Sequence, residues 1–142
     1  MSSFAYASAK IRILAKLIDL IIVLFLGFAI RGGVGSVLGF LYSICADGMP
    51  FHKLQAQSIG KHLLGLRVIS QKGESALKSS VIRNAPVGLV TFLMIIPFWG
   101  WILSLLVGIP LGAYEISMIM RNSKHQRLGD EMAETVVVKN VS

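Results

Sequence analysis

Three charged side chains share one helical face at the start of the first apolar segment: Arg12, Lys16 and Asp19. Since a helix turns about 100° per residue, Lys16 lies about 40° and Asp19 about 20° around the axis from Arg12. A charge at the centre of a membrane helix costs about 2.5–3.5 kcal/mol, so such residues face a partner or a wet cavity and often mark an ion path. The pattern predicts either an ion or proton site at Asp19, or a structural Lys16–Asp19 pair at the interface, with the basic side chains reaching toward water.

Glu115 is the other acid within an apolar segment. It lies about 9 Å of helical rise from Arg121, and Asp19 lies at a similar depth past Arg12. We therefore expect both carboxylates in the same third of a helix bundle, where like charges in a low dielectric favour sharing a proton. The alternative is a structural ion pair of Glu115 with Lys16 or Arg83.

The segments that carry these charges are long and apolar, in a chain of which 54% is hydrophobic. The run 84–114 has no formal charge and, at about 1.5 Å per residue, exceeds one crossing of a bilayer core about 30 Å thick. Pro97 and Gly100, with tryptophans beside them, divide it. We predict four transmembrane helices, at about 9–30, 33–48, 81–96 and 99–121. The alternative for the last run is a single kinked helix with a re-entrant end.

The distribution of basic residues predicts the topology. The net charge is +7, and most of the lysines and arginines fall in three blocks separated by apolar runs. Four crossings place all three blocks, and both termini, on the cytoplasmic side, as the positive-inside rule requires. A cleaved signal peptide is disfavoured because Asp19 interrupts the first apolar stretch. Nucleic-acid binding is disfavoured because the aromatic residues lie in the apolar runs, apart from the basic blocks.

Two polar regions remain, a cytoplasmic loop at about 51–80 and a tail at 122–142. Ser58 is placed to cap a short amphipathic helix over Ile59–Leu64, and Gly65 to end it. The basic side chains of the loop are expected to contact anionic lipid headgroups at about 1 kcal/mol each, unless they serve topology alone. The residues in question are Lys53, Lys61 and Arg67.

Two β-branched or alternating runs, Leu66–Ser70 and Thr135–Val138, predict strands. A lone strand is unstable, so we expect them to pair. The predicted fold class is an all-α membrane protein of one domain, residues 1–142, with four transmembrane helices, a small amphipathic helix and a short two-stranded sheet. We find no Ser/His/Asp set, zinc spacing or phosphate loop, and one cysteine. We therefore expect no catalytic residue, cofactor or metal, and no enzyme activity.

Four motifs together resemble the RDD family of bacterial membrane proteins. They are Arg12-x-x-Ala15-x-x-Ile18-Asp19, SIGKHLLGLRVIS over 58–70, Ile82-Arg83-Asn84, and HQRLGDEMAETVVV over 125–138. The arginine and two aspartates that name the family match Arg12, Asp19 and Asp130. One departure is Glu134, where the family often has glycine, which puts the turn before the last strand in question. Asp130 is expected outside the bilayer, capping a short helix or pairing with Arg12 or Arg83.

The resemblance implies a protein of the bacterial cytoplasmic (inner) membrane with a role in transport, and some members look like monovalent cation/proton antiporters. Four helices rarely enclose a solute path, so a homo-oligomer is expected. The alternative is a non-catalytic scaffold or a lipid- or partner-binding module. The ion or proton pathway, or structural charge cluster, would comprise Arg12, Lys16, Asp19, Arg83, Glu115 and Asp130.

Overall fold

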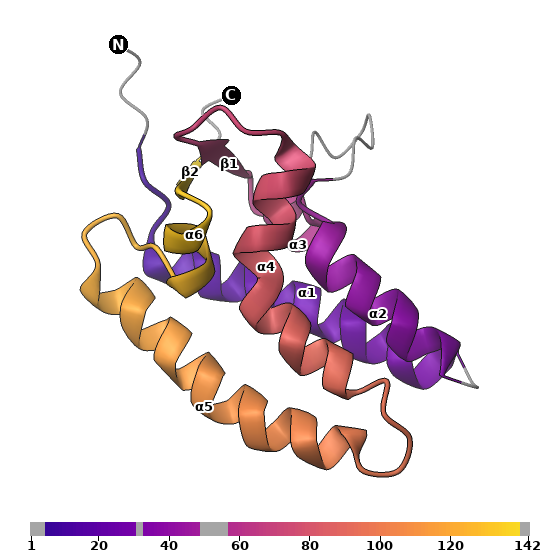
Figure 1. Cartoon of the computed structure of the whole chain (residues 1–142). Helices are drawn as coiled ribbons and strands as arrows, with labels where there is room; N and C mark the ends of the chain where they lie inside the picture. Colours follow the sequence, from indigo (N-terminus) through magenta and orange to yellow (C-terminus); the bar gives the residue numbers. More distant parts are fainter. Residues whose placement is uncertain (1–4, 31–32, 49–56, 140–142) are drawn as a thin grey trace.

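A computed structural model describes residues 5–30, 33–48 and 57–139 of the chain (Figure 1). Helices predominate, with one small sheet. The elements are α1 (Ala9–Ala29), α2 (Val34–Cys45), α3 (Ile59–Leu63), β1 (Leu66–Ser70), α4 (Ala76–Leu93), α5 (Gly100–Arg121), α6 (Leu128–Met132) and β2 (Thr135–Lys139).

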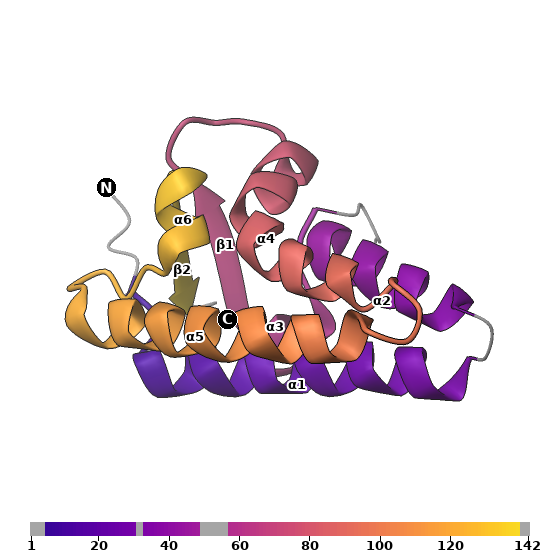
Figure 2. The same ribbon diagram turned by 60° about the horizontal axis from the view of Figure 1, so that its bottom comes forward.

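The long helices form two hairpins whose turns lie at the same end of the molecule (Figure 1). Helix α2 packs between α1 and α4, and α5 lies along α4 but touches α1 only sparsely. The short helix α6 and the sheet lie toward the opposite end, near the start of α1, and α3 lies against the middle of α1 (Figure 2). This end brings together segments that are far apart in the sequence.

The sheet is an antiparallel pair, with Leu66 opposite Lys139 and Ser70 opposite Thr135. The predicted strand pairing is therefore confirmed. The chain before α1 extends the sheet, because the backbone N–H of Ala7 donates to the carbonyl of Val137 at 3.0 Å. Ala7, Leu66 and Val137 form a small apolar core with Ala15 of α1, which fixes the sheet to the first helix.

The helix boundaries agree with the expected ones except in α4, which begins before 81 and ends before 96. Its early start follows from Ser75, whose Oγ accepts from the backbone N–H of Lys78 at 3.4 Å. The kinked single helix is wrong, because α4 and α5 are separate helices joined by the turn around Trp99. Gly65 ends α3 with φ +62°, as glycine permits.

Burial is inverted relative to a water-soluble domain. Most side chains that are buried in the helices are polar, whereas large apolar side chains face outward, for example Phe25, Phe28 and Leu106 with 68%, 82% and 70% exposure. Among the described residues, α5 alone is both long and apolar enough to cross a membrane by itself. Helix α1 is less apolar because one of its faces carries charged residues. Helix α2 is too short, since its 12 residues rise only about 18 Å.

Two pairs of glycines spaced four residues apart, Gly35/Gly39 and Gly108/Gly112, differ in how closely a neighbouring helix approaches them. A Cβ on Gly35 would lie 2.2 Å from the carbonyl oxygen of Leu26, and one on Gly39 would lie 3.2 Å from Val23, so this pair does bring α2 onto α1. A Cβ on Gly108 would lie 2.9 Å from Val90 of α4, but one on Gly112 would meet nothing within 4 Å. The space beside Gly112 is part of a cavity described below.

Glu134 occupies the turn before β2 with φ +47°, a left-handed conformation. This conformation costs a non-glycine residue about 1–2 kcal/mol, and glycine avoids the cost. We expect Glu134→Gly to raise the free energy of unfolding by about 1 kcal/mol in detergent micelles. The ion pair lost with Lys72 is exposed and contributes little. Glu134→Ala, which removes the same ion pair and keeps Cβ, is the control, and equal stability of the two variants would contradict the strain.

Candidate functional site

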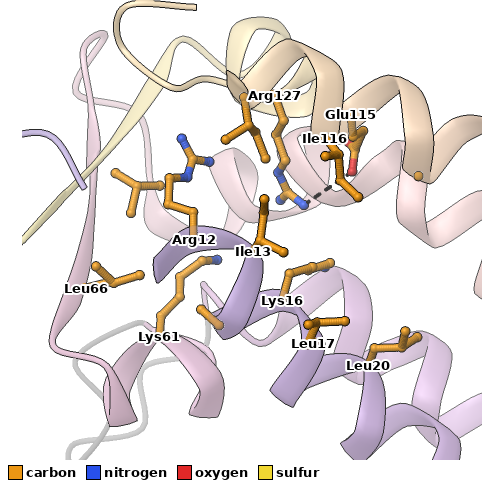
Figure 3. Close-up of a pocket in the computed structure, with 14 residues that line it drawn as sticks. Arg12, Ile13, Lys16, Leu17, Leu20, Lys61, Leu66, Glu115, Ile116 and Arg127 are labelled. Carbon is orange, nitrogen blue, oxygen red and sulfur yellow. Dashed lines mark ion pairs between the residues drawn. The ribbon is translucent and has the colours of Figure 1, made fainter. Parts of the chain in front are cut away.

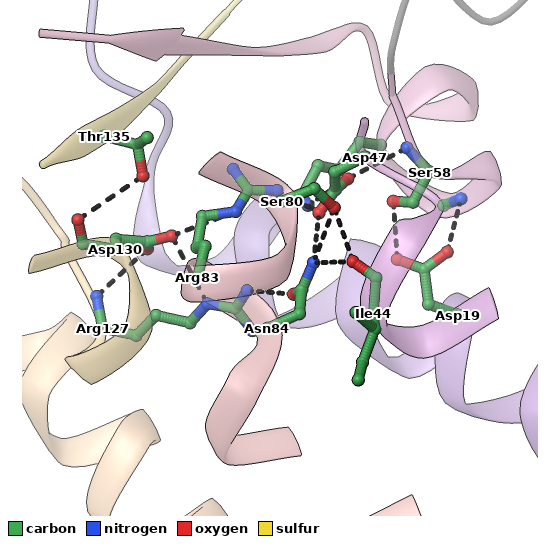
Figure 4. Close-up of polar contacts among 12 residues, drawn as sticks. Asp19, Ile44, Asp47, Ser58, Ser80, Arg83, Asn84, Arg127, Asp130 and Thr135 are labelled. Carbon is green, nitrogen blue, oxygen red and sulfur yellow. Dashed lines mark hydrogen bonds and ion pairs between the residues drawn. The ribbon is translucent and has the colours of Figure 1, made fainter. Parts of the chain in front are cut away.

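Asp130 of α6 is the centre of a buried charge cluster at the sheet end (Figure 4). Its carboxylate, 0% exposed, is ion-paired with Arg12 of α1 and lies 3.4 Å from Nε of Arg127 and 3.7 Å from Nε of Arg83. It also accepts from the backbone N–H of Arg127 at 3.2 Å, which caps the start of α6. Arg12 donates in addition to the carbonyl of His125. The expected pairing of Asp130 with Arg12 and Arg83, and its capping role, are thus both present.

Asp47, which directly follows α2, is the centre of a second cluster. Both carboxylate oxygens lie 2.6 Å from Nζ of Lys61, and the side chain accepts from Arg83 and, at 3.1 Å, from Asn84. Arg83 therefore bridges Asp47 and Asp130. Arg127 strengthens the link because its Nη2 donates to Oδ1 of Asn84 at 2.6 Å. The two clusters form one network joining α1, α2, α3, α4 and α6.

Asp19 accepts three hydrogen bonds and forms no ion pair with any residue that the structure describes. Its donors are the hydroxyl of Tyr42 at 2.8 Å, Oγ of Ser58 at 2.7 Å and the backbone N–H of Gly60 at 2.9 Å. Ser58 is the residue before α3, as expected, but its hydroxyl donates to Asp19 instead of capping the helix. A Cβ on Gly60 would lie 2.2 Å from the carbonyl oxygen of Ala15, so glycine is needed for α3 to approach α1. Asp19 thus fastens α3 to α1.

The two buried aspartates outside the long helices, Asp47 and Asp130, are held charged. Burial by itself would raise the pKa of Asp130, but Arg127, Arg12 and Arg83 lower that pKa well below its usual range. Burial likewise opposes ionisation of Asp47, and Arg83 and Lys61 outweigh it and lower its pKa. Burial and the charge of Arg83 lower the pKa of Lys61 to about 7, against the attraction of Asp47.

These shifts predict the acid dependence of stability. A carboxyl whose pKa is lower when folded stabilises the fold above its unfolded pKa and loses that contribution as the pH falls. The ordinary pKa of an aspartate side chain, which we take for the unfolded state, is 3.8. The unfolding midpoint in detergent should therefore be flat between about pH 5 and 6 and fall steeply below about pH 4. Lys61 is protonated in both states there and adds no slope. A midpoint that stays flat down to about pH 3 would contradict the charged state of the network.

A cavity of about 200 Å³ lies between α1 and α5, beside this network (Figure 3). Four basic side chains line it: Arg12, Lys16, Lys61 and Arg127. Glu115 is the acid at the cavity; it is 7% exposed, one of its oxygens lies 3.8 Å from Arg127, and the other, Oε1, has no hydrogen-bond partner in the described chain. The expected partners of Glu115, Lys16 and Arg83, are replaced by Arg127.

Lys16 has neither an ion-pair nor a hydrogen-bond partner for its ammonium group within the described part of the chain, so the predicted Lys16–Asp19 pair is absent. The network and cavity together hold five basic side chains, Arg12, Lys16, Lys61, Arg83 and Arg127, and four acidic ones, Asp19, Asp47, Glu115 and Asp130. With all nine groups ionised, one positive charge is in excess, and Lys16, whose ammonium group has no partner among the described residues, lies at the cavity.

The predicted site residues are therefore brought to one end of the molecule but divided between separate sites. Asp19 lines a different cavity of about 20 Å³ and shares no direct contact with Glu115, so the expected pair of acids does not form. Lys61 does not project from the loop surface: it is 9% exposed, because α3 turns it inward onto Asp47, and it also lines the cavity between α1 and α5. Arg67 is exposed on β1, and Lys53 lies outside the described residues.

Asp47 is the main residue that the sequence reading missed. It follows an apolar helix directly, so the reasoning applied to Asp19, an acid beside apolar sequence needing a partner, also applied here. Asn84 and Tyr42 carried no such signal, because uncharged polar residues are common in membrane helices. Across the described ranges, no group of three His, Cys, Asp or Glu side chains is placed to hold a metal ion.

Comparison with known proteins adds one finding. The model described as the RDD family matches residues 6–134, which is most of the chain. No curated protein and no solved structure matches it.

Proposed function

Since the chain belongs to the RDD family of membrane-associated proteins, we propose that it is a multi-pass module of the bacterial cytoplasmic membrane that binds the phosphate headgroup of an anionic lipid. The headgroup occupies the cavity between α1 and α5. The observation that carries the proposal is the unpartnered Lys16 ammonium in a cavity lined by four basic side chains.

The membrane placement follows from the outward-facing apolar side chains. The four long helices cross the bilayer, with both hairpin turns on the outer side and the sheet, α3, α6 and both termini in the cytoplasm. The charge network then lies at the cytoplasmic level of the bundle, where basic pockets between helices bind anionic headgroups. Helix α2 is short for a bilayer core, so local thinning or tilt accompanies this arrangement.

The walls of the cavity suit an amphiphile. Its basic side is formed by Lys16 and the arginines, and its other side by Leu17, Leu20 and Ile116, which are half exposed on the surface of the helices. A phosphodiester beside Lys16 neutralises the excess positive charge, and its acyl chains continue over the apolar wall. Since an unpaired charge beside apolar side chains is costly, lipid binding also stabilises the fold.

Native mass spectrometry tests this with mixed phosphatidylglycerol and phosphatidylcholine. The wild type should retain phosphatidylglycerol preferentially, and Lys16→Gln should weaken that retention about five- to tenfold, as expected for about 1 kcal/mol or slightly more per basic contact. Lys10→Gln, on the exposed face of α1, is the matched control. Equal retention by both variants would remove the site.

A second test fills the cavity between α1 and α5 without changing any charge, and it uses one blocking variant and one control. Gly112→Leu directs a side chain into the cavity, because a Cβ there meets nothing within 4 Å. Ala113→Leu places a leucine on the exposed face of α5 instead. Only Gly112→Leu should displace phosphatidylglycerol. Displacement by Ala113→Leu alone would place the lipid elsewhere.

Exchange of a proton for a monovalent cation is the second candidate, favoured by the buried Oε1 of Glu115, which has no partner in the described residues. Asp19 suits it less, because three donors already occupy its oxygens. Because four helices enclose little space, exchange requires a homo-oligomer. Proteoliposomes with an internal pH dye and a sodium pulse test it: exchange should be lost in Glu115→Gln and kept in Glu131→Gln. Absence of any sodium-dependent pH change in the wild type would leave lipid binding as the function.

A further inference from the structure

A second large cavity, of about 220 Å³, lies between β1 and the first turns of α4. Its walls include Arg67 and Ser70 from β1, and Ser79 and Arg83 from α4. It shares no lining residue with the cavity between α1 and α5. It lies at the sheet end of the molecule, where the chain is polar, and the proposed function makes no use of it.

Three residues that line this cavity carry hydrogen-bond donors without partners. Oγ of Ser70, Oγ of Ser79 and Nη1 of Arg83 are buried and have no partner in the part of the chain that the structure describes. Ser79 is 5% exposed and Arg83 is 1% exposed. Buried donors of this kind are rare, because a buried donor that forms no hydrogen bond lowers the stability of the fold. The neighbouring Ser80 is satisfied, since its Oγ donates to the carbonyl of Ile44 at 2.6 Å.

The acceptors at the cavity are already used. Asp47 accepts from Arg83, Lys61 and Asn84, and Glu74 accepts from Nζ of Lys78 at 2.7 Å. The unmet requirement is therefore for a ligand with several acceptor oxygens. The amino end of α4, an 18-residue helix, adds a partial positive charge to that of Arg67. A tetrahedral oxyanion offers several acceptor oxygens in a compact volume, whereas a single carbonyl offers one.

We propose that this cavity binds a phosphoryl group, held by Arg83, Ser70 and Ser79, with Arg67 at its edge. The group is supplied either by free phosphate from the cytoplasm or by the phosphomonoester of a lipid such as phosphatidic acid. Both sources present the same oxygens to the same donors.

The test uses the full chain in detergent micelles free of phospholipid. The thermal unfolding midpoint is followed during titration with sodium phosphate, and with sodium chloride at matched ionic strength. Phosphate should raise the midpoint beyond the effect of chloride. Ser70→Ala and Ser79→Ala should fold normally, since each hydroxyl lacks a partner, but should need at least about tenfold more phosphate for the same shift. Ser117→Ala, on α5, should titrate as the wild type does. Arg83 is left unchanged because it also holds Asp47.

A second arm identifies the source. In nanodiscs of phosphatidylcholine, the midpoint is compared with and without added phosphatidic acid. Stabilisation by inorganic phosphate in micelles identifies free phosphate, and stabilisation by phosphatidic acid alone identifies a lipid. The proposal is overturned if neither stabilises the chain, or if both serine variants respond as the wild type does, which would leave water as the occupant. Lys16→Gln should not alter the phosphate titration, so this proposal and the proposed function fail independently.

Discussion

Asp130→Asn is expected to lower the free energy of unfolding by about 3–5 kcal/mol. The substitution keeps the shape of the side chain but leaves three arginines without their shared negative charge in a buried position. An uncompensated buried charge costs far more than an exposed one, so α6 and the sheet should separate from α1 and α4. Chemical unfolding in detergent micelles, followed by tryptophan fluorescence, measures the change.

Glu131→Gln is the matched control, because Glu131 is exposed on the same helix and should change stability by less than about 0.5 kcal/mol. The pair Arg12→Gln and Asp130→Asn adds a second check. Each single substitution leaves the other side chain of the pair buried without its ion-pair partner. The double variant should therefore lose less stability than the two single losses added together. Additive losses would mean that the two side chains do not interact.

Gly129→Ala should be similarly damaging for a steric reason. A Cβ at this position would lie 1.7 Å from the backbone oxygen of Arg83, and backbone cannot yield as a flexible side chain can. Helix α6 would have to move away from α4, which pulls Asp130 out of the network. We expect a loss of about 3 kcal/mol or more, in the range seen when core overpacking and a broken buried ion pair combine.

Gly27→Ala tests whether the effect at Gly129 is local. Gly27 lies in α1, and a Cβ there would meet nothing within 4 Å. Alanine should therefore stabilise the helix by about 0.5–1 kcal/mol. If Gly129→Ala is as harmless as Gly27→Ala, then α6 does not pack against α4 as described.

Much of the fold could be predicted because it depends on local signals. Apolar runs, Gly65 and the β-branched residues of 135–138 set the helices, the end of α3 and the strands. The start of α4 could not be placed, because the sequence before 81 is polar and its helical signal is the single cap Ser75. The strand pair followed from a physical requirement, that a single strand needs a partner.

The site was predicted less well, because partners depend on tertiary arrangement. The sequence indicated that Asp19 and Glu115 needed neighbours, but helix azimuth alone could not show that α3 would fold back onto Asp19. It also gave no sign that Arg127, from the tail, would reach Glu115. Lys61 illustrates the same point: a lysine in a polar loop was expected to face headgroups, and the turn of α3 directs it onto Asp47 instead.

The excess positive charge at Lys16 is the feature on which the proposed function depends. The most direct measurement is ¹⁵N–³¹P dipolar dephasing by solid-state NMR, on chain with ¹⁵N-labelled lysine side chains in phosphatidylglycerol bilayers. We expect a strongly dephased lysine ammonium signal, at hydrogen-bond distance from phosphate, that is missing from the Lys16→Gln spectrum and unchanged in Lys10→Gln. An identical set of dephased signals in the wild type and in Lys16→Gln would contradict it.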